Sequence, residues 1–293
     1  MTRQTFTLEL ITPCFCAGAN AAQAEIRAPS IRGQLRWWFR ALGGNPADEG
    51  AIFGNVAGDA GTGSSLRIAI ARFKPGPTWN PPQVDPYTAE SYTWHYARES
   101  GKPANSGRQT AGPRWQAKGA IPPLSQFDLV ITTIRPLSPA RQQAFEVALQ
   151  AFLCFGTLGL RATRGLGAFH CAKAGNWKDI IEPLGKAGFR ITLRQQPDTF
   201  STWEAALRDW SAWLRYKLRK DCKAERFSAL GGIQPRQASA VRFRPIRLSS
   251  GQFTWLALEA PHARVLGQRA TEVLTPTLFT GPAPSPAPIT RAR

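Results

Sequence analysis

The three histidines are the residues of this sequence best suited to proton transfer near neutral pH. They are His95, His170 and His262, and no two of them are neighbours in the sequence. An enzyme that cleaves RNA without a metal needs such general acid–base groups close together in space. The histidines therefore allow the hypothesis of a metal-independent ribonuclease. Their wide separation in the sequence does not favour it.

The carboxylates and cysteines show no spacing typical of a metal centre. A metal-dependent nuclease needs clustered carboxylates, whereas Asp48-Glu49, Asp59 and Asp221 form no cluster in the sequence. The five cysteines stand at positions 14, 16, 154, 171 and 222. Their odd number and the lack of a C-x-x-C pair indicate reduced thiols, as in a cytosol. We expect no metal and no cofactor.

A stronger candidate for function is a basic stripe on a helix predicted over 31–42. Apolar residues recur at helical spacing on one face of this segment: Ile31, Leu35, Trp38 and Leu42. Ser30 is a natural N-cap. Arg32, Arg36 and Arg40 are four residues apart and form a stripe on the opposite face, with no acidic residue among them. A solvated face is the ordinary interpretation of such charges, and a phosphate backbone lying across the helix is the one that we favour.

A second candidate is the glycine-rich loop over 156–167, which contains Arg161 and Arg164. Glycine lets a backbone approach a ligand closely, so we expect Gly165 and Gly167 to lie near phosphate. The loop is not a P-loop, because no Gly-Lys-Ser/Thr follows. A tight connection between helix and strand is the plain alternative. Five further arginines are secondary candidates for RNA contact: Arg27, Arg108, Arg114, Arg242 and Arg244.

Charge points these motifs toward nucleic acid. Lys plus Arg is 37 and Asp plus Glu is 19, which gives a net charge of +18 over 293 residues. Such a surplus repels itself until a polyanion neutralises it. A basic surface without a specific partner and a membrane-surface protein are the alternatives. The N-terminus lacks the apolar region of a signal peptide, and the apolar stretch 144–160 is interrupted by Glu146 and Gln150. We therefore expect a cytoplasmic protein with no membrane partner.

The elements that position these motifs follow the order β-α-β-β-α-β. Alternating apolar residues predict strands at 5–11, 66–70, 127–131 and 168–171, and capped amphipathic patterns predict helices at 31–42 and from 139. This order is typical of a ferredoxin-like (RRM-like) domain. We predict an α+β protein with two such domains, at 1–180 and 185–274, followed by a Pro-rich tail at 275–293. The first domain carries a long insertion at about 74–123, and the second lacks a recognisable last strand.

Together these motifs resemble one family, the RAMP superfamily, and most closely the first Cmr subunit of type III-B CRISPR effectors. The resemblance rests on ITP at 11–13, PSIRGQLRWWFRALGG at 29–44, IFG at 52–54, KGAIPP at 118–123, LRATRGLG at 160–167 and ASAV at 238–241. It covers residues 6–170 well and the rest loosely. The arginine–tryptophan helix is fairly specific to this subunit, whereas the glycine loop marks only the superfamily.

The resemblance implies a non-catalytic subunit of a multi-subunit complex. Its partners would be CRISPR RNA, target RNA and other RAMP subunits, and it would touch the 3′ portion of the guide and the target. A metal-independent endoribonuclease that processes guide RNA, from the same superfamily, is the alternative. We expect the arginine stripe and the loop to line one RNA groove. Replacing Arg36 and Arg164 together should then weaken RNA binding with little loss of stability.

Overall fold

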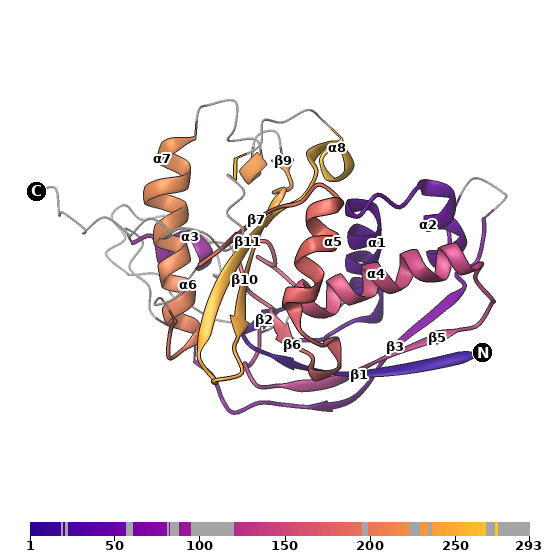
Figure 1. Ribbon diagram of the computed structural model, residues 1–293. Helices are drawn as coiled ribbons and strands as arrows, with labels where there is room; N and C mark the ends of the chain where they lie inside the picture. Colours follow the sequence, from indigo (N-terminus) through magenta and orange to yellow (C-terminus); the bar gives the residue numbers. More distant parts are fainter. Residues whose placement is uncertain are drawn as a thin grey trace, which may run out of the picture.

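Two antiparallel sheets and two sets of helices form alternating layers in this protein (Figure 1). The computed structural model describes residues 1–18, 20, 23–56, 61–80, 82, 88–94, 120–194, 199–222, 229–233, 236–267 and 273–274. No helix in these described ranges is long and apolar enough to cross a membrane.

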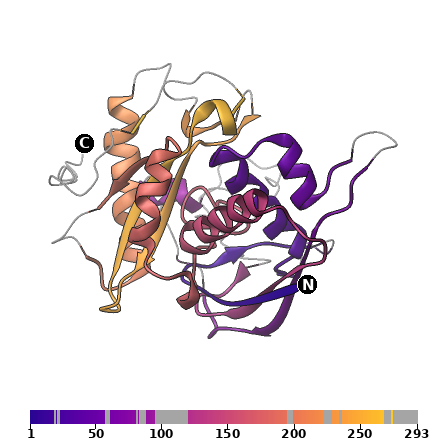
Figure 2. The ribbon, with the colours of Figure 1, turned by 45° about the vertical axis from the view of Figure 1, so that its right-hand side comes forward.

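The first sheet has four strands in the order β3-β5-β1-β6. Their bounds are β1 Thr2–Leu10, β3 Leu66–Lys74, β5 Gln126–Thr133 and β6 Phe169–His170. Helices α1 (Ala28–Ala41) and α4 (Pro139–Phe155) contact each other and lie on the same face of this sheet (Figure 2). The β-α-β-β-α-β order predicted for this part of the chain is confirmed, including the N-cap of α4 at Ser138.

Helix α1 begins two residues before the predicted N-cap. Its N-cap is Arg27, whose backbone is extended, and no side chain caps the first turn. Ser30 already lies within the helix, and its N–H donates to the Arg27 carbonyl at 3.0 Å. The predicted Ser30 cap is therefore wrong. Pro29 explains the earlier start, because proline favours the first turn, where its missing N–H is not needed.

Small elements connect the first sheet to its helices and to the second half of the chain. They are β2 Cys14–Phe15, α2 Pro46–Phe53, α3 Glu90–Trp94, β4 Ala120–Ile121, the 3₁₀ turns η1 Ala172–Ala174 and η2 Trp177–Ile180, and α5 Ile181–Lys186. Helix α3 lies within the predicted insertion at 74–123. Residues 95–119, half of that insertion, are outside the described ranges.

The second sheet has three strands in the order β10-β11-β7. Their bounds are β7 Arg190–Leu193, β10 Val241–Arg247 and β11 Phe253–Glu259. One face is covered by α6 (Trp203–Ala212), which continues as the π-helix η3 (Trp213–Leu218) and α7 (Arg219–Asp221). A short hairpin, β8 (Gly232–Ile233) and β9 (Arg236–Gln237), and helix α8 (His262–Val265) complete this half. The described residues contain no fourth strand in this sheet.

Strand β10 is buried on both of its faces. Val241 and Phe243 face α6, where the Phe243 ring stacks on Trp210 with centroids 3.7 Å apart. Arg242 and Arg244 alternate with them and face α1 and the end of α4. Both hydrophobic clusters of the protein draw residues from the two halves of the chain. The predicted boundaries at 180, 185 and 274 remain predictions.

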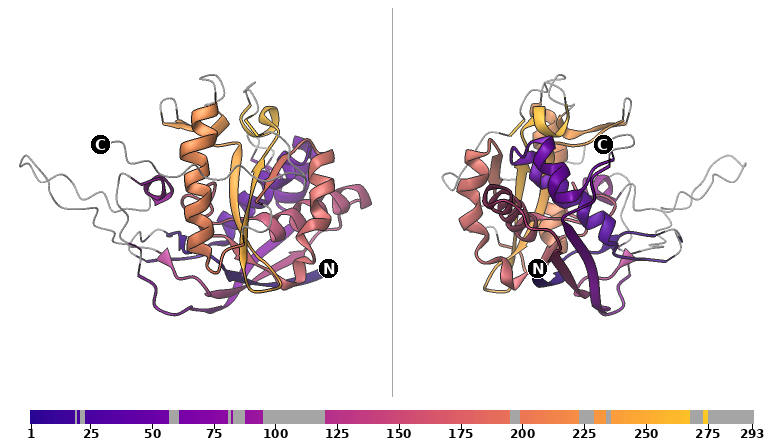
Figure 3. Two further views of the ribbon diagram at one scale, coloured as in Figure 1. Left: turned by 60° about the vertical axis from the view of Figure 1, so that its left-hand side comes forward. Right: turned by 90° about the vertical axis from the view of Figure 1, so that its right-hand side faces the viewer.

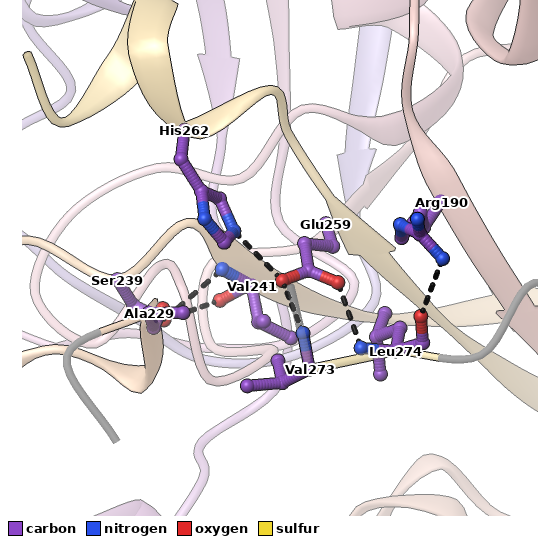
Figure 4. Close-up of polar contacts among 8 residues, drawn as sticks. All are labelled: Arg190, Ala229, Ser239, Val241, Glu259, His262, Val273 and Leu274. Carbon is purple, nitrogen blue, oxygen red and sulfur yellow. Dashed lines mark hydrogen bonds and ion pairs between the residues drawn. The ribbon is translucent and has the colours of Figure 1, made fainter. Parts of the chain in front are cut away.

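A buried carboxylate at the end of β11 holds the last described residues in place (Figure 4). Glu259, only 1% exposed, accepts hydrogen bonds from the backbone N–H groups of Val273 (2.8 Å) and Leu274 (2.7 Å). Oε1 of Glu259 also lies 2.7 Å from Nε2 of His262. Arg190 donates to the Leu274 carbonyl from the neighbouring strand. This cluster fixes residues 273–274 against the second sheet.

Candidate nucleic-acid interface

The predicted arginine stripe lies on the face of α1 turned away from the core, but it has an acidic partner. Glu49 of α2 is 6% exposed and receives Arg36 Nε at 2.6 Å and Arg40 Nε at 3.6 Å. The expectation of a stripe without carboxylates is therefore wrong. Arg32 forms no ion pair with any described residue. Two of the three guanidinium groups thus share one carboxylate, and each keeps N–H groups that Glu49 does not use.

Gly33 stands in the middle of this exposed face. A Cβ atom built on Gly33 meets nothing within 4 Å, so no contact within the described structure requires glycine there. Glycine inside a helix costs roughly 0.5–1 kcal/mol relative to alanine. Gly33 therefore weakens the helix without a packing reason inside the protein. The close approach of a partner's backbone to α1 would explain why glycine stands there. Sequence reasoning missed Gly33, although a glycine inside a capped helix was its visible signal.

The N-terminus of α1 adds to the positive character of this face. The first turn contains no acidic residue, and the cap residue Arg27 offers no side-chain oxygen. The N-terminal end of a helix carries partial positive charge. Arg27, one of the secondary candidates, is half-buried at this end. The arginines and the helix end therefore present positive charge along one side of α1, which we call the α1 face.

The glycine-rich loop is organised differently, because Arg164 is a core residue with 3% exposure. Its guanidinium donates to Ser239 Oγ at 3.1 Å, to the Val241 carbonyl at 3.3 Å and to the Leu230 carbonyl. A phosphate contact requires an accessible guanidinium, so Arg164 does not fit the predicted role. Its loss would remove the side-chain donor of the buried Leu230 carbonyl, so we expect its replacement to cost stability, contrary to the expectation from the sequence.

The two loop glycines serve packing within the protein. Gly165 and Gly167 both have positive φ, at 87° and 67°. The Gly167 N–H donates to the Pro13 carbonyl at 2.9 Å, and a Cβ there would lie 1.9 Å from the Leu158 carbonyl oxygen. The Gly165 carbonyl accepts a hydrogen bond from Thr12 Oγ1 at 2.9 Å. At these two positions the loop is the tight connection that we held as the plain alternative.

Arg161 and Arg164 meet at Tyr92 of α3 and not at α1. The Arg161, Arg164 and Arg219 guanidinium carbons lie 5.1, 5.6 and 5.0 Å from the centre of the Tyr92 ring. Arg161 also donates from Nε to the Thr93 carbonyl at 3.0 Å. Burial alone would raise the pKa of Tyr92. Arg164 and the other two arginines together lower this pKa by more than burial raises it, so the net pKa lies below 10. Sequence reasoning missed this cluster because Tyr92 lies inside the long insertion.

Helix α3 lies beside α6, and further arginines of α6 and η3 hold it there (Figure 3). Arg208 Nε is 3.3 Å from a Glu90 carboxylate oxygen, and Arg215 donates to the Thr88 carbonyl at 2.5 Å. The side of the protein around α3 is therefore rich in arginine. The arginines of this second basic region contact α3 and the residues before it, whereas those of the α1 face contact Glu49 of α2.

The remaining secondary candidates are mostly structural. Arg242 is 7% exposed, donates to Gln34 Oε1 at 3.0 Å and lies 3.5 Å from the centre of the Trp37 ring. Arg244 is 2% exposed and donates to the carbonyls of Cys154, Gly156 and Phe169. Burial lowers the pKa of each guanidinium to about 9, so both stay protonated at neutral pH. Arg108 and Arg114 lie outside the described residues.

The described histidines form no acid–base pair. His262 is 7% exposed and bonded to the Glu259 carboxylate. His170 lies in β6 opposite Glu9 of β1, and burial together with Arg247 lowers its pKa below 6.5. His95 lies outside the described residues. Within the described ranges, no group of three His, Cys, Asp or Glu side chains is placed to hold a metal ion.

Sequence comparison gives the class of protein. Residues 7–170, more than half of the chain, match the model of the RAMP superfamily. The chain belongs to that superfamily. Among curated proteins it is similar to the CRISPR system Cmr subunit Cmr1-1 of Pyrococcus furiosus, at 27% identity over 168 residues, 55% of this chain and 44% of that protein. Subunit Cmr1-2 of the same organism is 54% identical over 39 residues, 13% of this chain and 21% of that protein.

Structure comparison leads to a Cmr1 protein of the same organism. The crystal structure of apo Cmr1 from Pyrococcus furiosus superposes with a TM-score of 0.52 at 17% identity, over 96% of this chain and 92% of that one. The fold is thus shared along nearly the whole chain. The sequence matches, in contrast, cover less than half the length of either curated relative. The predicted likeness to RAMP proteins, and to Cmr1 among them, is confirmed.

Proposed function

We propose that this chain is a non-catalytic, cytoplasmic RNA-binding subunit of a type III-B CRISPR (Cmr) effector complex. Within it, the chain contacts the 3′ portion of the guide RNA and the target RNA, joins other RAMP subunits and contributes to antiviral defence. Its relatives are Cmr subunits of a CRISPR system, which supports the assignment to such a complex. The net charge of +18 supports RNA as the ligand.

The α1 face is the observation that carries the RNA-binding part of this proposal. It combines exposed or half-exposed guanidinium groups, an uncapped helix N-terminus and a glycine that no internal contact explains. Arginine binds phosphate through several N–H groups at once, and a helix N-terminus attracts anions. The buried arginines of β10 and the loop are excluded from this role by their contacts.

We also propose that the second half is a shortened copy of the first. The order β7-β11-β10 repeats the order β1-β5-β3 of the first, third and second strands of the first sheet. In both halves a helix follows the first strand. Among the described residues, the second ferredoxin-like domain would then have the first three of its four strands.

The test is an RNA-binding titration with the Arg32→Ala variant. Arg32 has no ion pair with a described residue, so its removal leaves no unpaired carboxylate. We expect weaker binding to single-stranded RNA and a salt slope that is shallower by about 0.7 for one lost phosphate contact. Arg67→Ala is the matched control, because Arg67 is an exposed arginine on β3. Equal affinities for both variants and the wild type would remove the α1 face from the proposal.

The endoribonuclease alternative needs a separate assay. The purified chain is incubated with CRISPR repeat RNA in the presence of a chelator. A non-catalytic subunit leaves the RNA intact. A metal-independent nuclease yields products, and these disappear when the histidine that acts as its general acid or base is replaced. Products that depend on His170 would replace our proposal with the alternative.

A further inference from the structure

An apolar cavity of about 340 Å³ lies between the two halves of the chain. Its lining comes from the end of β1, the two ends of the insertion, the start of α6 and the β10–β11 hairpin. The main lining residues are Ile11, Trp79, Leu124, Trp203, Glu204 and Phe253. Its volume falls in the range of roughly 300–1,000 Å³ that is typical of small-ligand sites. None of these residues belongs to the α1 face.

Aromatic rings form the body of the cavity. Trp79 is half-buried and stacks on Trp94, with centroids 6.1 Å apart and planes inclined by 24°. The Phe15 ring meets Trp79 edge-on at 6.2 Å and so fixes its orientation. Trp203, which is 8% exposed, and half-buried Phe253 line the cavity as well. The cavity therefore offers preoriented aromatic faces.

The lip of the cavity is strained. Leu124 has a φ of 64°, in the left-handed region that disfavours branched side chains, yet its side chain is 52% exposed. Its N–H donates to the Leu10 carbonyl at 2.7 Å, which ties this conformation to the end of β1. Backbone strain of this kind is concentrated at active sites, ligand clamps and switch regions. Burying Leu124 under a ligand would recover the exposed apolar surface.

Both kinds of hydrogen-bonding group border this apolar cavity. The Glu204 carboxylate forms no hydrogen bond or ion pair with the described residues, so its acceptors are available. Arg247 supplies donors, and its position is fixed by Glu9, whose Oε1 lies 2.5 Å from Nη1. An aliphatic side chain in the cavity would bury Glu204 without giving it a donor, which is costly. The occupant therefore needs a flat apolar body with N–H groups at its edge.

We infer that this cavity binds one unstacked nucleobase of the RNA, with its ring against Trp79 and Phe253 and an amino or imino N–H donating to Glu204. Proteins commonly recognise single-stranded RNA by stacking a splayed base on aromatic rings and bonding its edge. The arginines around α3 supply positive charge nearby, since Trp79 stacks on Trp94, the last residue of that helix. This inference rests on the proposed RNA-binding function.

The test removes the base and the pocket separately. A short single-stranded RNA carries an abasic nucleotide at each position in turn, which deletes a base but keeps every phosphate. At one position the deletion should weaken wild-type binding about tenfold, the size of one base–aromatic stacking contact. In the Trp79→Ala variant the same deletion should have little further effect. Trp177→Ala is the control, because Trp177 is a half-buried tryptophan outside the cavity, and it should respond as the wild type does.

The outcomes separate the two proposals. If RNA binds and Arg32→Ala weakens it, but no abasic position is coupled to Trp79, the base pocket is wrong and the proposed function stands. If the wild type binds no RNA, both fail. Should Trp79→Ala not fold, Glu204→Gln and Leu124→Gly replace it, since both residues are partly exposed. Retention of full abasic sensitivity in those two variants likewise overturns the pocket. Loss of binding to a neighbouring subunit, with RNA binding unchanged, assigns the cavity to a protein and overturns the inference.

Discussion

The arginines of α1 and those of β10 have the same chemistry but opposite surroundings. On α1, Arg36 and Arg40 reach one carboxylate and remain partly in solvent. On β10, Arg242 and Arg244 are buried and give their N–H groups to an amide and to main-chain carbonyls. The net charge of the chain therefore overstates the charge that a polyanion meets. Residue type identifies a basic protein, but the layer that covers an arginine decides whether it binds a ligand or holds the fold.

Replacing a buried arginine should give the largest effect on stability. Arg244→Ala leaves three buried carbonyls, those of Cys154, Gly156 and Phe169, without this donor. With roughly 1–3 kcal/mol for each unsatisfied group, we expect a loss of at least about 3 kcal/mol in the free energy of unfolding. Denaturant titration measures it, with Arg67→Ala as control at within about 0.5 kcal/mol of the wild type. A loss below about 1 kcal/mol would contradict the structural role of Arg244.

The carboxylate shared on α1 should have opposite effects on stability and binding. Glu49→Gln removes the ion pairs with Arg36 and Arg40, which we expect to cost about 1 kcal/mol because Arg36 and Arg40 are partly exposed. RNA binding should strengthen, since the α1 face gains one net positive charge. The gain should fade at high salt, where screening is strong. Weaker RNA binding by a folded Glu49→Gln variant would contradict the phosphate account of this face.

Gly33 offers a test of the α1 face that leaves its arginines unchanged, because a side chain added at Gly33 would contact none of the described residues outside its chain neighbours. Gly33→Ala should stabilise α1 by about 0.5–1 kcal/mol, since the added methyl meets no neighbour. RNA binding should nevertheless weaken, because the methyl stands where the partner approaches. Thermal unfolding and an RNA titration of the same sample give both values. If the variant is more stable and binds equally well, the glycine has no role in recognition.

Arg247 is intermediate between the two groups, and its effect should be the smallest. Burial alone would raise the pKa of its partner Glu9. Hydrogen bonds from Gln126 and Arg247 lower this pKa by more than burial raises it, so the net pKa lies below 4.5. The ionised form stabilises the fold above the unfolded-state pKa, and this contribution is lost as the pH falls through the folded-state pKa. Between pH 7 and pH 3, Glu9→Gln should lose less stability than the wild type. An equal loss in both proteins would show that the pair contributes nothing.

The sequence predicted what local patterns determine. Ser138 caps its helix as expected, because a cap depends on the next few residues. The burial of Arg242 and Arg244 could not be predicted in this way. Their alternation with Val241 and Phe243 is typical of a strand with one face in solvent, whereas α1 and the end of α4 cover that face here. Glu49 was missed for the same reason, since its pairing depends on how α2 packs on α1.

The double burial of β10 has a consequence for how the chain can be divided. A cut between α5 and β7 would leave the first fragment with unpaired carbonyls at the end of α4 and the second with the two β10 guanidiniums in solvent. Neither fragment is then expected to fold alone, and the intact chain should unfold in one calorimetric transition. The two fragments mixed together should reassemble, with β10 as the recognition element of the complementation.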